Sequence, residues 1–312
     1  MKNNFIKFFL LILFVCNLSY AEQFKFETSE IEILDNGNLD AKNGKAISLD
    51  GNLEVQAEKF EYKKNQNTLK AYKGIAFLKP ENLKIEFNEI ILDQNNLITT
   101  AKDKVKVIDL NKQISIQTDH ISFDKKKNIL ESQNQSVLKD NKGNILSANI
   151  FEYNLSDGIL KLKNANLKDF NKNTFNIESA FLNTLTNQLI GKDISINLNN
   201  ESFDQDNDPR IKGKSIIYND GLTEVTKGVF TTCKKTDKCP PWQLSAEKIQ
   251  HDPKKEIINY KNAILRVYDV PVMYFPKFFH PDPNVKRKSG FLIPTIKNSA
   301  NSTNYFSIPY FS

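Results

Sequence analysis

Residue types that bind metals or carry out catalysis are scarce in this sequence. The chain of 312 residues contains three histidines, three cysteines, two methionines and one tryptophan. His120, His251 and His280 do not stand at metal-ligand spacing with other donors. We also find no glycine-rich loop that would cradle a phosphate and no nucleophile elbow. We therefore expect no metal, no cofactor and no enzymatic activity, and we assign the scattered Asp and Glu residues to solvated strand faces and turns.

Long apolar runs are also missing, except at the N-terminus. Residues 8–15 form an uninterrupted apolar stretch, preceded by Lys2 and Lys7 and followed by the small-x-small sequence Ser19-Tyr20-Ala21. The stretch is much shorter than the roughly 20 residues that a membrane-spanning helix needs. This pattern predicts a secretory signal peptide, residues 1–21, cleaved after Ala21. Cys16 would leave with the signal peptide.

The sequence also lacks an excess of charge of one sign. It carries 43 Lys and Arg residues against 37 Asp and Glu residues, which gives a net charge of +6. Because basic and acidic residues are interspersed, a nucleic-acid partner is not expected. The apolar content of 39% is enough to bury a core, in one large β domain or two smaller ones.

What the sequence does contain is alternating hydrophobicity from residue 55 to residue 264. Short runs such as 114–117 (ISIQ) and 160–163 (LKLK) have the two-residue period of a half-buried strand. Clusters of Asn, Asp, Gly and Lys separate these runs and mark turns. No helical period is found after the signal peptide, so we expect an all-β fold.

The strands follow a longer repeat of about thirty residues. A small residue is followed three positions later by a large apolar one, and often by an aromatic residue two positions further. Examples are Ala57, Phe60 and Tyr62; Thr118, Ile121 and Phe123; Ala148, Phe151 and Tyr153; and Ala246, Ile249 and His251. The large apolar positions are 60, 90, 121, 151, 181, 216 and 249, with gaps of 30, 31, 30, 30, 35 and 33 residues. Seven units of this regularity indicate a repeated supersecondary structure.

Each unit is expected to be a bent hairpin. The step of three interrupts the two-residue alternation, which predicts a bulge or corner within the strand. Stacked bent hairpins would give an elongated, open jelly roll or flattened solenoid with one continuous apolar interior. An ordinary β sandwich with the same number of strands is the alternative. The sequence does not decide whether the inward aromatic residues fill a closed core or line a groove.

Proline marks a boundary near Cys239. Only Pro80 and Pro209 precede it, whereas nine prolines follow it. Because proline cannot donate to a sheet ladder, we expect a structured crossover, not a further repeat, over residues 270–288. Residues 289–296 and 304–312 then read as two strands with one proline each.

A family resemblance begins at Asp208. The segments that carry it are 208–215 (DPRIKGKS), 218–221 (YNDG), 228–233 (GVFTTC), 240–252 (PPWQLSAEKIQHD), 260–276 (YKNAILRVYDVPVMYFP) and 279–294 (FHPDPNVKRKSGFLIP). Over about its last hundred residues the chain strongly resembles the LptD family, also called OstA or organic-solvent-tolerance proteins. The repeats from residue 23 to residue 200 resemble the OstA-like domain of that family only in pattern.

The resemblance implies transport and insertion of lipopolysaccharide into the outer leaflet of the outer membrane. An OstA-like periplasmic β jelly roll over residues 22–288 would receive the lipid from an LptA-like bridge protein. Residues 289–312 would be the first two strands of an outer-membrane β barrel, which an LptE-like lipoprotein plugs in the family. Because the chain stops at Ser312, we expect it to be a fragment of a longer barrel protein.

The resemblance also suggests roles for particular residues. The lipid would be held by hydrophobic contact, and the expected lining residues are Phe60, Tyr62, Phe87, Ile121, Phe123, Phe151, Tyr153, Ile216 and Tyr218. Pro294 and Pro309 would weaken a lateral gate in the barrel, or only shape its rim. The run 286–288 (KRK) would mark the junction of domain and barrel, where it would meet lipid phosphates or form a solvated turn.

The two cysteines of the mature chain are expected to be oxidised after export. Five residues separate Cys233 from Cys239, so a local disulfide is sterically possible. The resemblance offers a second partner for Cys233, at the distal end of the barrel.

Two other classes of protein remain as alternatives. A secreted β-solenoid adhesin or surface-layer protein would have a closed, packed interior and no barrel strands after Ser289. A β-helix enzyme that processes polysaccharide would have facing carboxylates on one exposed sheet, which the spacing does not suggest. Alternating strands of about ten residues in the downstream reading frame would decide for the LptD-like alternative.

Overall fold

The structure is a computed structural model that describes residues 24–34, 36–170, 172–199, 208–219, 221–236, 240–282, 290–291, 295–297 and 305–311. The expected signal peptide and the basic run 286–288 lie outside these residues. The all-β prediction is confirmed: apart from one 3-10 turn at Lys64–Gln66, every regular element is a strand. Within the described residues, no helix combines the length and apolarity needed to cross a membrane.

Nineteen of the strands form one antiparallel sheet. They are β1 (Phe24–Ile33), β2 (Leu39–Ser48), β3 (Leu53–Lys63), β4 (Thr68–Leu78), β5 (Leu83–Asp93), β6 (Ile98–Asp109), β7 (Ile114–Asp124), β8 (Ile129–Ser132), β9 (Ser136–Lys139), β10 (Ile145–Ala148), β11 (Ile150–Asn154), β12 (Ile159–Lys168), β13 (Thr174–Asn183), β14 (Gln188–Asn197), β15 (Arg210–Asn219), β16 (Leu222–Thr231), β17 (Trp242–Asp252), β18 (Ile257–Val267) and β19 (Val270–Pro281).

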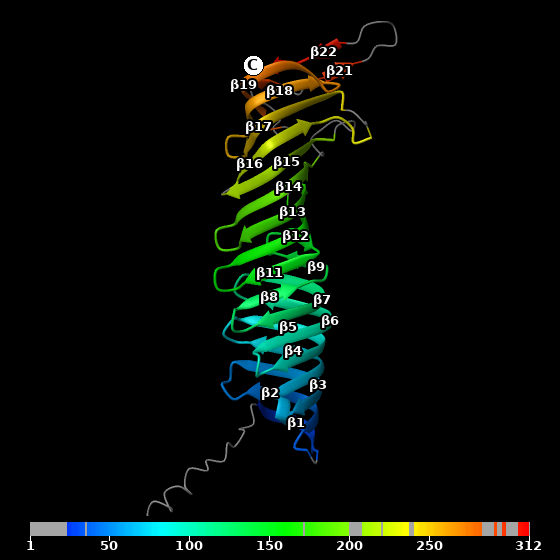
Figure 1. Cartoon of the computed structure of the whole chain (residues 1–312), viewed down its shortest axis with the longest axis vertical. Coiled ribbons are helices and arrows are strands. Elements are labelled where there is room, and N and C mark those ends of the chain that lie inside the picture. Colours follow the sequence, from blue (N-terminus) through cyan, green and yellow to red (C-terminus); the bar gives the residue numbers. More distant parts are fainter. Residues whose placement is uncertain are drawn as a thin grey trace, which may run out of the picture.

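The strands are stacked in chain order along one long axis (Figure 1). Strands β1 to β7 and β12 to β19 each pair antiparallel with the next strand in sequence. Between them, β8 and β9 together pair with β7, and β10 and β11 together pair with β12, so each couple acts as one interrupted strand. The result is a single bent sheet, not the two sheets of an ordinary sandwich.

The predicted corner is confirmed in strand β3. Val55 and Ala57 face inward before it, and Phe60 and Tyr62 face inward after it. The ladder to β4 joins Ala57 with Gly74 and Lys59 with Tyr72, and it omits Lys73, whose φ is +50°. Left-handed residues occur at the equivalent place in other strands, at Asn43, Asp103, Lys104, Asn164, Asp193, Lys227 and Asn262. No other described element covers the inner face of the sheet, and its buried side chains form one cluster, so the two halves on either side of the corner cover each other.

Small residues occupy the inside of the corner for a steric reason. A Cβ atom added to Gly74 would lie 2.0 Å from the carbonyl oxygen of Gln56 and 2.8 Å from the Ala57 Cβ. The two strands therefore approach too closely for a side chain at Gly74. Ala57, the small residue of the thirty-residue motif in this unit, is the ladder partner of Gly74 and lies at this close approach.

The hairpin turns form two lines, one at each end of the strands, and hydrogen bonds join successive turns in each line. We call these two lines of turns edge A and edge B. Edge A contains the turns at 49–52, 79–82, 110–113 and 140–144, and edge B contains the turns at 64–67, 94–97, 125–128, 155–158 and 184–187. On edge A, Asn82 Nδ2 donates to Asn111 Oδ1 over 2.7 Å, and on edge B, Asn67 Nδ2 donates to Asn95 Oδ1 over 2.9 Å. In each pair the two side chains are about one repeat apart, so hydrogen bonds link successive turns along each edge.

Six of the seven predicted repeat centres are buried, and the seventh is wrong. Phe60, Ile90, Ile121, Phe151, Ile216 and Ile249 are each at most 1% exposed. Phe181, by contrast, is 51% exposed on the outer face. In β13 the step of three runs from Ile177 to Ala180, so the corner falls one residue earlier than the pattern suggests and the small residue stands after it.

The crossover expected over residues 270–288 is also corrected. Residues 270–281 form β19, a regular twelve-residue strand that continues the sheet. Its prolines stand where the ladder is interrupted or ends: Pro271 is next to a bulge, Pro276 is at the corner that the register skips, and Pro281 is at the strand end. Proline is compatible with strands at such positions.

The last two predicted strands pair with each other, but each is in two pieces. β20 (Gly290–Phe291) pairs with β23 (Tyr310–Phe311), and β21 (Thr295–Lys297) pairs with β22 (Tyr305–Ser307). Pro309 lies between β22 and β23, whereas Pro294 lies outside the described residues.

Candidate functional site: an apolar interior

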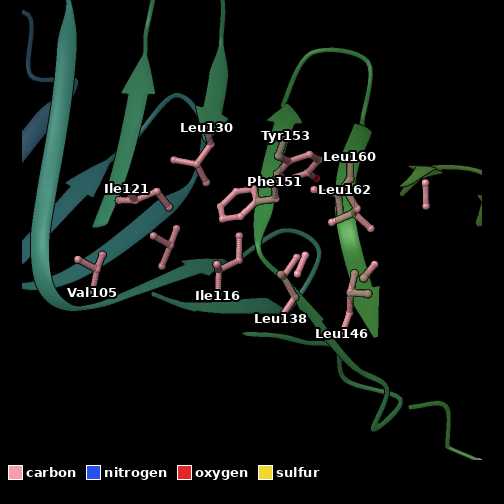
Figure 2. Packing of buried hydrophobic residues seen from close by; sticks show 14 of the residues in the cluster. Val105, Ile116, Ile121, Leu130, Leu138, Leu146, Phe151, Tyr153, Leu160 and Leu162 are labelled. Atoms are coloured by element: carbon pink, nitrogen blue, oxygen red, sulfur yellow. The ribbon is translucent and has the colours of Figure 1, made fainter. Parts of the chain in front are cut away.

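The inner sides of the strands form one apolar interior that runs through the described sheet. Eight of the nine residues expected to line it are buried there: Phe60, Tyr62, Phe87, Ile121, Phe123, Phe151, Tyr153 and Ile216. Figure 2 shows Ile121, Phe151 and Tyr153 converging with Leu130 and Leu160 from neighbouring strands. The structure therefore brings together side chains that the repeat spaces about thirty residues apart.

Tyr218 is the exception among the nine. It lies on the same side of β15 as Ile216 but at the end of the strand, and it is 37% exposed. Its expected burial in the interior is wrong, because the strand ends one residue later and leaves the ring at the rim.

In the described residues, large side chains fill the middle of the interior. Phe60, Phe123 and Phe151 are among its largest fully buried side chains. A cavity of about 40 Å³ lies where edge A meets edge B, between residues such as Asp50 and Lys125. Pockets for drug-sized ligands have volumes of about 300–1,000 Å³. In the state described, this cavity is far too small for an acyl chain.

Edge A and edge B meet along a seam that closes the interior laterally. Lys125 of edge B forms an ion pair with Asp50 of edge A, at 3.7 Å between Nζ and Oδ2. Further along, Lys112 of edge A reaches Tyr153 and Thr184 on the side of edge B. The Lys125–Asp50 and Lys112–Thr184 contacts join residues 75 and 72 positions apart, about two and a half repeats, so the strands run obliquely to the long axis.

At the N-terminal end, part of the inner face of the sheet extends beyond the core and is exposed to solvent. Ile33 of β1 is paired with Leu39, and Ile31 with Ala41. Directly paired residues share a face of a sheet, so both isoleucines belong to the inner face. Leu39 and Ala41 are buried, yet Ile33 is 73% exposed. The apolar inner surface is thus accessible at this end.

The C-terminal end repeats this arrangement on the other half of the sheet. A row of directly paired inner residues runs through Phe230, Leu244, Leu265 and Met273. The first three are buried, and Met273 of β19 is 48% exposed. The apolar row therefore continues from the core to an accessible surface.

A polar network caps the core beside this end. The Tyr260 hydroxyl donates to His280 Nε2 over 2.8 Å, and His280 Nδ1 donates to the Pro281 carbonyl oxygen over 2.7 Å. Burial lowers the pKa of His280 to about 4 and raises the pKa of the Tyr260 hydroxyl. Both groups are therefore neutral at neutral pH, which suits their place among Phe230, Phe278 and Trp242.

Asp50 lies at the seam and remains ionised, unlike His280 and Tyr260, which are neutral. Its carboxylate accepts hydrogen bonds from the Ser48 hydroxyl and the Asn52 backbone N–H, which lower its pKa to about 2. In the part of the chain that the structure describes, no three His, Cys, Asp or Glu side chains gather as a metal site would require.

The predicted disulfide is not seen. Cys233 is a partly buried free thiol whose Sγ lies 3.5 Å from the Trp242 carbonyl oxygen. Cys239 lies outside the described residues.

Sequence reasoning missed the residues at the ends of the interior and at the seam. Ile31, Ile33 and Met273 precede or follow the motif, and only strand pairing shows that they continue its rows. Lys112 stands in an ordinary polar turn, and no local signal indicates its contact with Tyr153, 41 positions away.

Part of the chain is similar to curated proteins of one kind. It is 39% identical to "LPS-assembly protein LptD" of Nitrosococcus oceani over 89 residues, which are 28% of this chain and 12% of that protein. It is 43% identical to the protein of the same name from Shewanella denitrificans over 82 residues, 26% of this chain and 10% of that protein. The corresponding match in Yersinia pestis is 34% identical over 89 residues, 28% of this chain and 11% of that protein.

These matches cover only part of each protein. The similar segment spans about a tenth of the length of the curated relatives. No family model matches the chain. The resemblance to LptD proteins that the motifs predict is thus confirmed, over somewhat more than a quarter of this chain.

Proposed function

We propose that this protein takes part in lipopolysaccharide assembly at the outer membrane by carrying the lipid along its apolar interior, without a chemical step. The observation behind the proposal is that rows of inner-face residues pass from the core to an exposed surface at each end of the sheet, one row at each end. One row ends at Ile33 at the N-terminal end, and a second row, on the other half of the sheet, ends at Met273 at the C-terminal end. The similarity to proteins named for lipopolysaccharide assembly gives the class of cargo.

Acyl chains suit such a path energetically. Removing a methylene from water stabilises the bound state by about 0.8 kcal/mol, so a chain of ordinary length gains several kcal/mol even in a partly wet groove. The side chains that would contact it are Phe60, Tyr62, Phe87, Ile121, Phe123, Phe151, Tyr153 and Ile216. Because the middle is packed, the two halves of the sheet must separate along the seam while lipid passes.

The N-terminal end would receive the lipid from a bridge protein of the LptA kind. Strand β1 pairs with β2 on one side, and its other edge has no ladder partner among the described strands. A free strand edge beside exposed isoleucines can be extended by a strand of another chain.

The rest of the proposal follows the family resemblance. The exported chain would continue into an outer-membrane barrel with an LptE-like plug, and Pro294 and Pro309 would weaken its lateral gate. Cys233 would form its disulfide with Cys239 or with the distal part of the barrel.

Direct binding tests the proposal. The purified chain should gain thermal stability with increasing lipopolysaccharide, because a ligand that binds only the folded state stabilises it by mass action. Met273→Glu should weaken this effect. An unchanged melting temperature at saturating lipid would contradict the proposal.

The packed middle favours one alternative, a structural β protein of the cell surface. Such a protein needs no ligand and no separable seam. The same titration separates the two functions, since a structural protein would show no dependence on lipid.

A further inference from the structure

Among the described residues of the seam, Lys112 is a lysine that forms no ion pair with a carboxylate. The Lys112 ammonium donates hydrogen bonds to the hydroxyls of Tyr153 and Thr184, the latter over 3.2 Å, and lies 4.8 Å from the centre of the Tyr153 ring. Thr184 Oγ1 in turn donates to the Gly158 carbonyl oxygen over 3.0 Å. Within the described part of the chain, these neutral groups are the partners of the Lys112 ammonium.

The carboxylate of Asp109, in the same turn as Lys112, has backbone N–H groups as its partners. Asp109 accepts the backbone N–H groups of Asn111 and Lys112, at 3.0 and 2.9 Å, and so shapes the turn. By contrast Lys125, the other lysine that crosses the seam, has Asp50 as its counter-ion. Two lysines therefore bridge the same seam, one neutralised and one not.

The position of Lys112 suggests a function for its unpaired charge. Tyr153 is buried on the inner face beside Phe151 and Leu160 (Figure 2), while Lys112 is only partly buried. Lys112 thus stands at the boundary between the apolar interior and water. An amphiphile whose acyl chains lie inside must place its polar head at this boundary.

We propose that Lys112, with the hydroxyls of Tyr153 and Thr184, is a binding site for a phosphate group on the head of the carried lipid. The inference rests on the proposed function, since it requires acyl chains in the interior. A phosphate would replace two neutral acceptors by anionic oxygens, and hydrogen bonds between charged partners are about twice as strong as neutral ones. The two hydroxyls would then donate to the same phosphate.

The test measures the affinity of the full chain for lipopolysaccharide and for the same lipid after enzymatic removal of its phosphates. Lys112→Gln should lower the affinity for the phosphorylated lipid about tenfold, the loss expected for one charge-assisted hydrogen bond. It should leave the affinity for the dephosphorylated lipid unchanged. Lys112→Arg should restore most of the loss.

Lys125→Gln is the matched control, because it removes a lysine from the same seam without removing an unbalanced charge. It should bind the phosphorylated lipid as the parent chain does. Equal affinity of Lys112→Gln and the parent for the phosphorylated lipid would overturn the site while leaving lipid carriage intact. Equal losses for both lipids would also overturn it, since Lys112 would then only hold the seam. Failure of the parent chain to bind either lipid would instead overturn the proposed function. Competition by inorganic phosphate alone, without lipid binding, would show a free-phosphate site and contradict the headgroup assignment.

Discussion

Leu265 and Met273 are directly paired on neighbouring strands and share the inner face of the sheet, yet Leu265 is buried and Met273 is half exposed. The boundary between core and accessible surface therefore lies between two adjacent side chains of one row. Ile33 and Leu39 stand in the same relation at the opposite end. An interior that reaches the surface at both ends is what a conduit for a lipid requires.

A charge at Met273 should interfere with the lipid but not with the fold. Because this side chain is already exposed, we expect Met273→Glu to change the free energy of unfolding by less than about 0.5 kcal/mol. The affinity for lipopolysaccharide should fall, since a carboxylate repels acyl chains and phosphates alike. Ile217→Glu, at an exposed position on the outer face, is the control and should bind lipopolysaccharide normally. An equal loss of affinity in Ile217→Glu would show that the exposed end of the inner face at Met273 has no special role in lipid binding.

Two phenylalanines from corresponding repeats should behave differently when truncated. Phe151→Ala should cost about 3–5 kcal/mol of stability, because it opens a cavity in the packed middle. Phe181→Ala should cost little, because Phe181 lies on the outer face. Chemical denaturation of both variants measures the difference, and similar losses would contradict the face assigned to β13.

Neighbouring residues at the corner of β4 should respond to opposite substitutions. Gly74→Ala should destabilise the protein by at least about 1–3 kcal/mol, since the new Cβ would collide with the Gln56 carbonyl oxygen. Lys73→Gly should be neutral or stabilising, because glycine adopts the positive φ of this residue without strain.

Lys73→Gly also removes an ion pair, but this pair contributes little to stability. Its ion pair with Glu58 is solvent-exposed, at 3.4 Å, and such pairs contribute between about 0 and 1 kcal/mol. Urea unfolding curves of the Gly74→Ala and Lys73→Gly variants measure both changes in stability. A stable Gly74→Ala variant would show that the strands do not approach as closely as described.

Acid should weaken the C-terminal end of the fold through His280. Its pKa is lowered from 6.5 to about 4 in the folded state, so the unfolded chain binds a proton first as the pH falls. Stability is therefore complete above pH 6.5 and is lost as the pH falls from about 6.5 to about 4, by roughly 3 kcal/mol in all.

The groups around His280 are Tyr260, Asp282 and His251, and His251 contacts Asp282 at 2.5 Å. The His280→Gln variant should be less stable at pH 7 but should lose much less stability between pH 7 and pH 4.5. Equal slopes of unfolding free energy against pH in variant and parent would exclude His280 as the responsible group.

The repeat could be predicted because its cause is local. The alternation fixes which side chains face inward, and the step of three fixes the corner, so Phe60, Ile121 and Phe151 were placed correctly from their spacing alone. Phe181 was misplaced because a bulky residue happens to follow Ala180, and the spacing does not show which of the two faces the core. The prolines of β19 suggested a break because a sequence does not reveal which backbone groups the ladder already leaves unpaired.

The ends and the seam could not be predicted, because they depend on how the halves of the sheet are offset. That offset brings Lys112 to Thr184 and Lys125 to Asp50, and it also leaves Ile33 and Met273 without cover. It is a sum of small twists over many strands, and no single residue encodes it.

Site-specific photocrosslinking in cells shows directly which face of the sheet contacts lipopolysaccharide. A photoreactive phenylalanine analogue would be placed at Phe123 or Phe151, on the inner face, and at Glu61 or Lys161, on the outer face, in the protein as the cell makes it. If the interior carries the lipid, both inner positions should capture lipopolysaccharide and neither outer position should. Capture at the outer positions alone, or at none of the four in cells that export lipopolysaccharide normally, would contradict carriage along the interior.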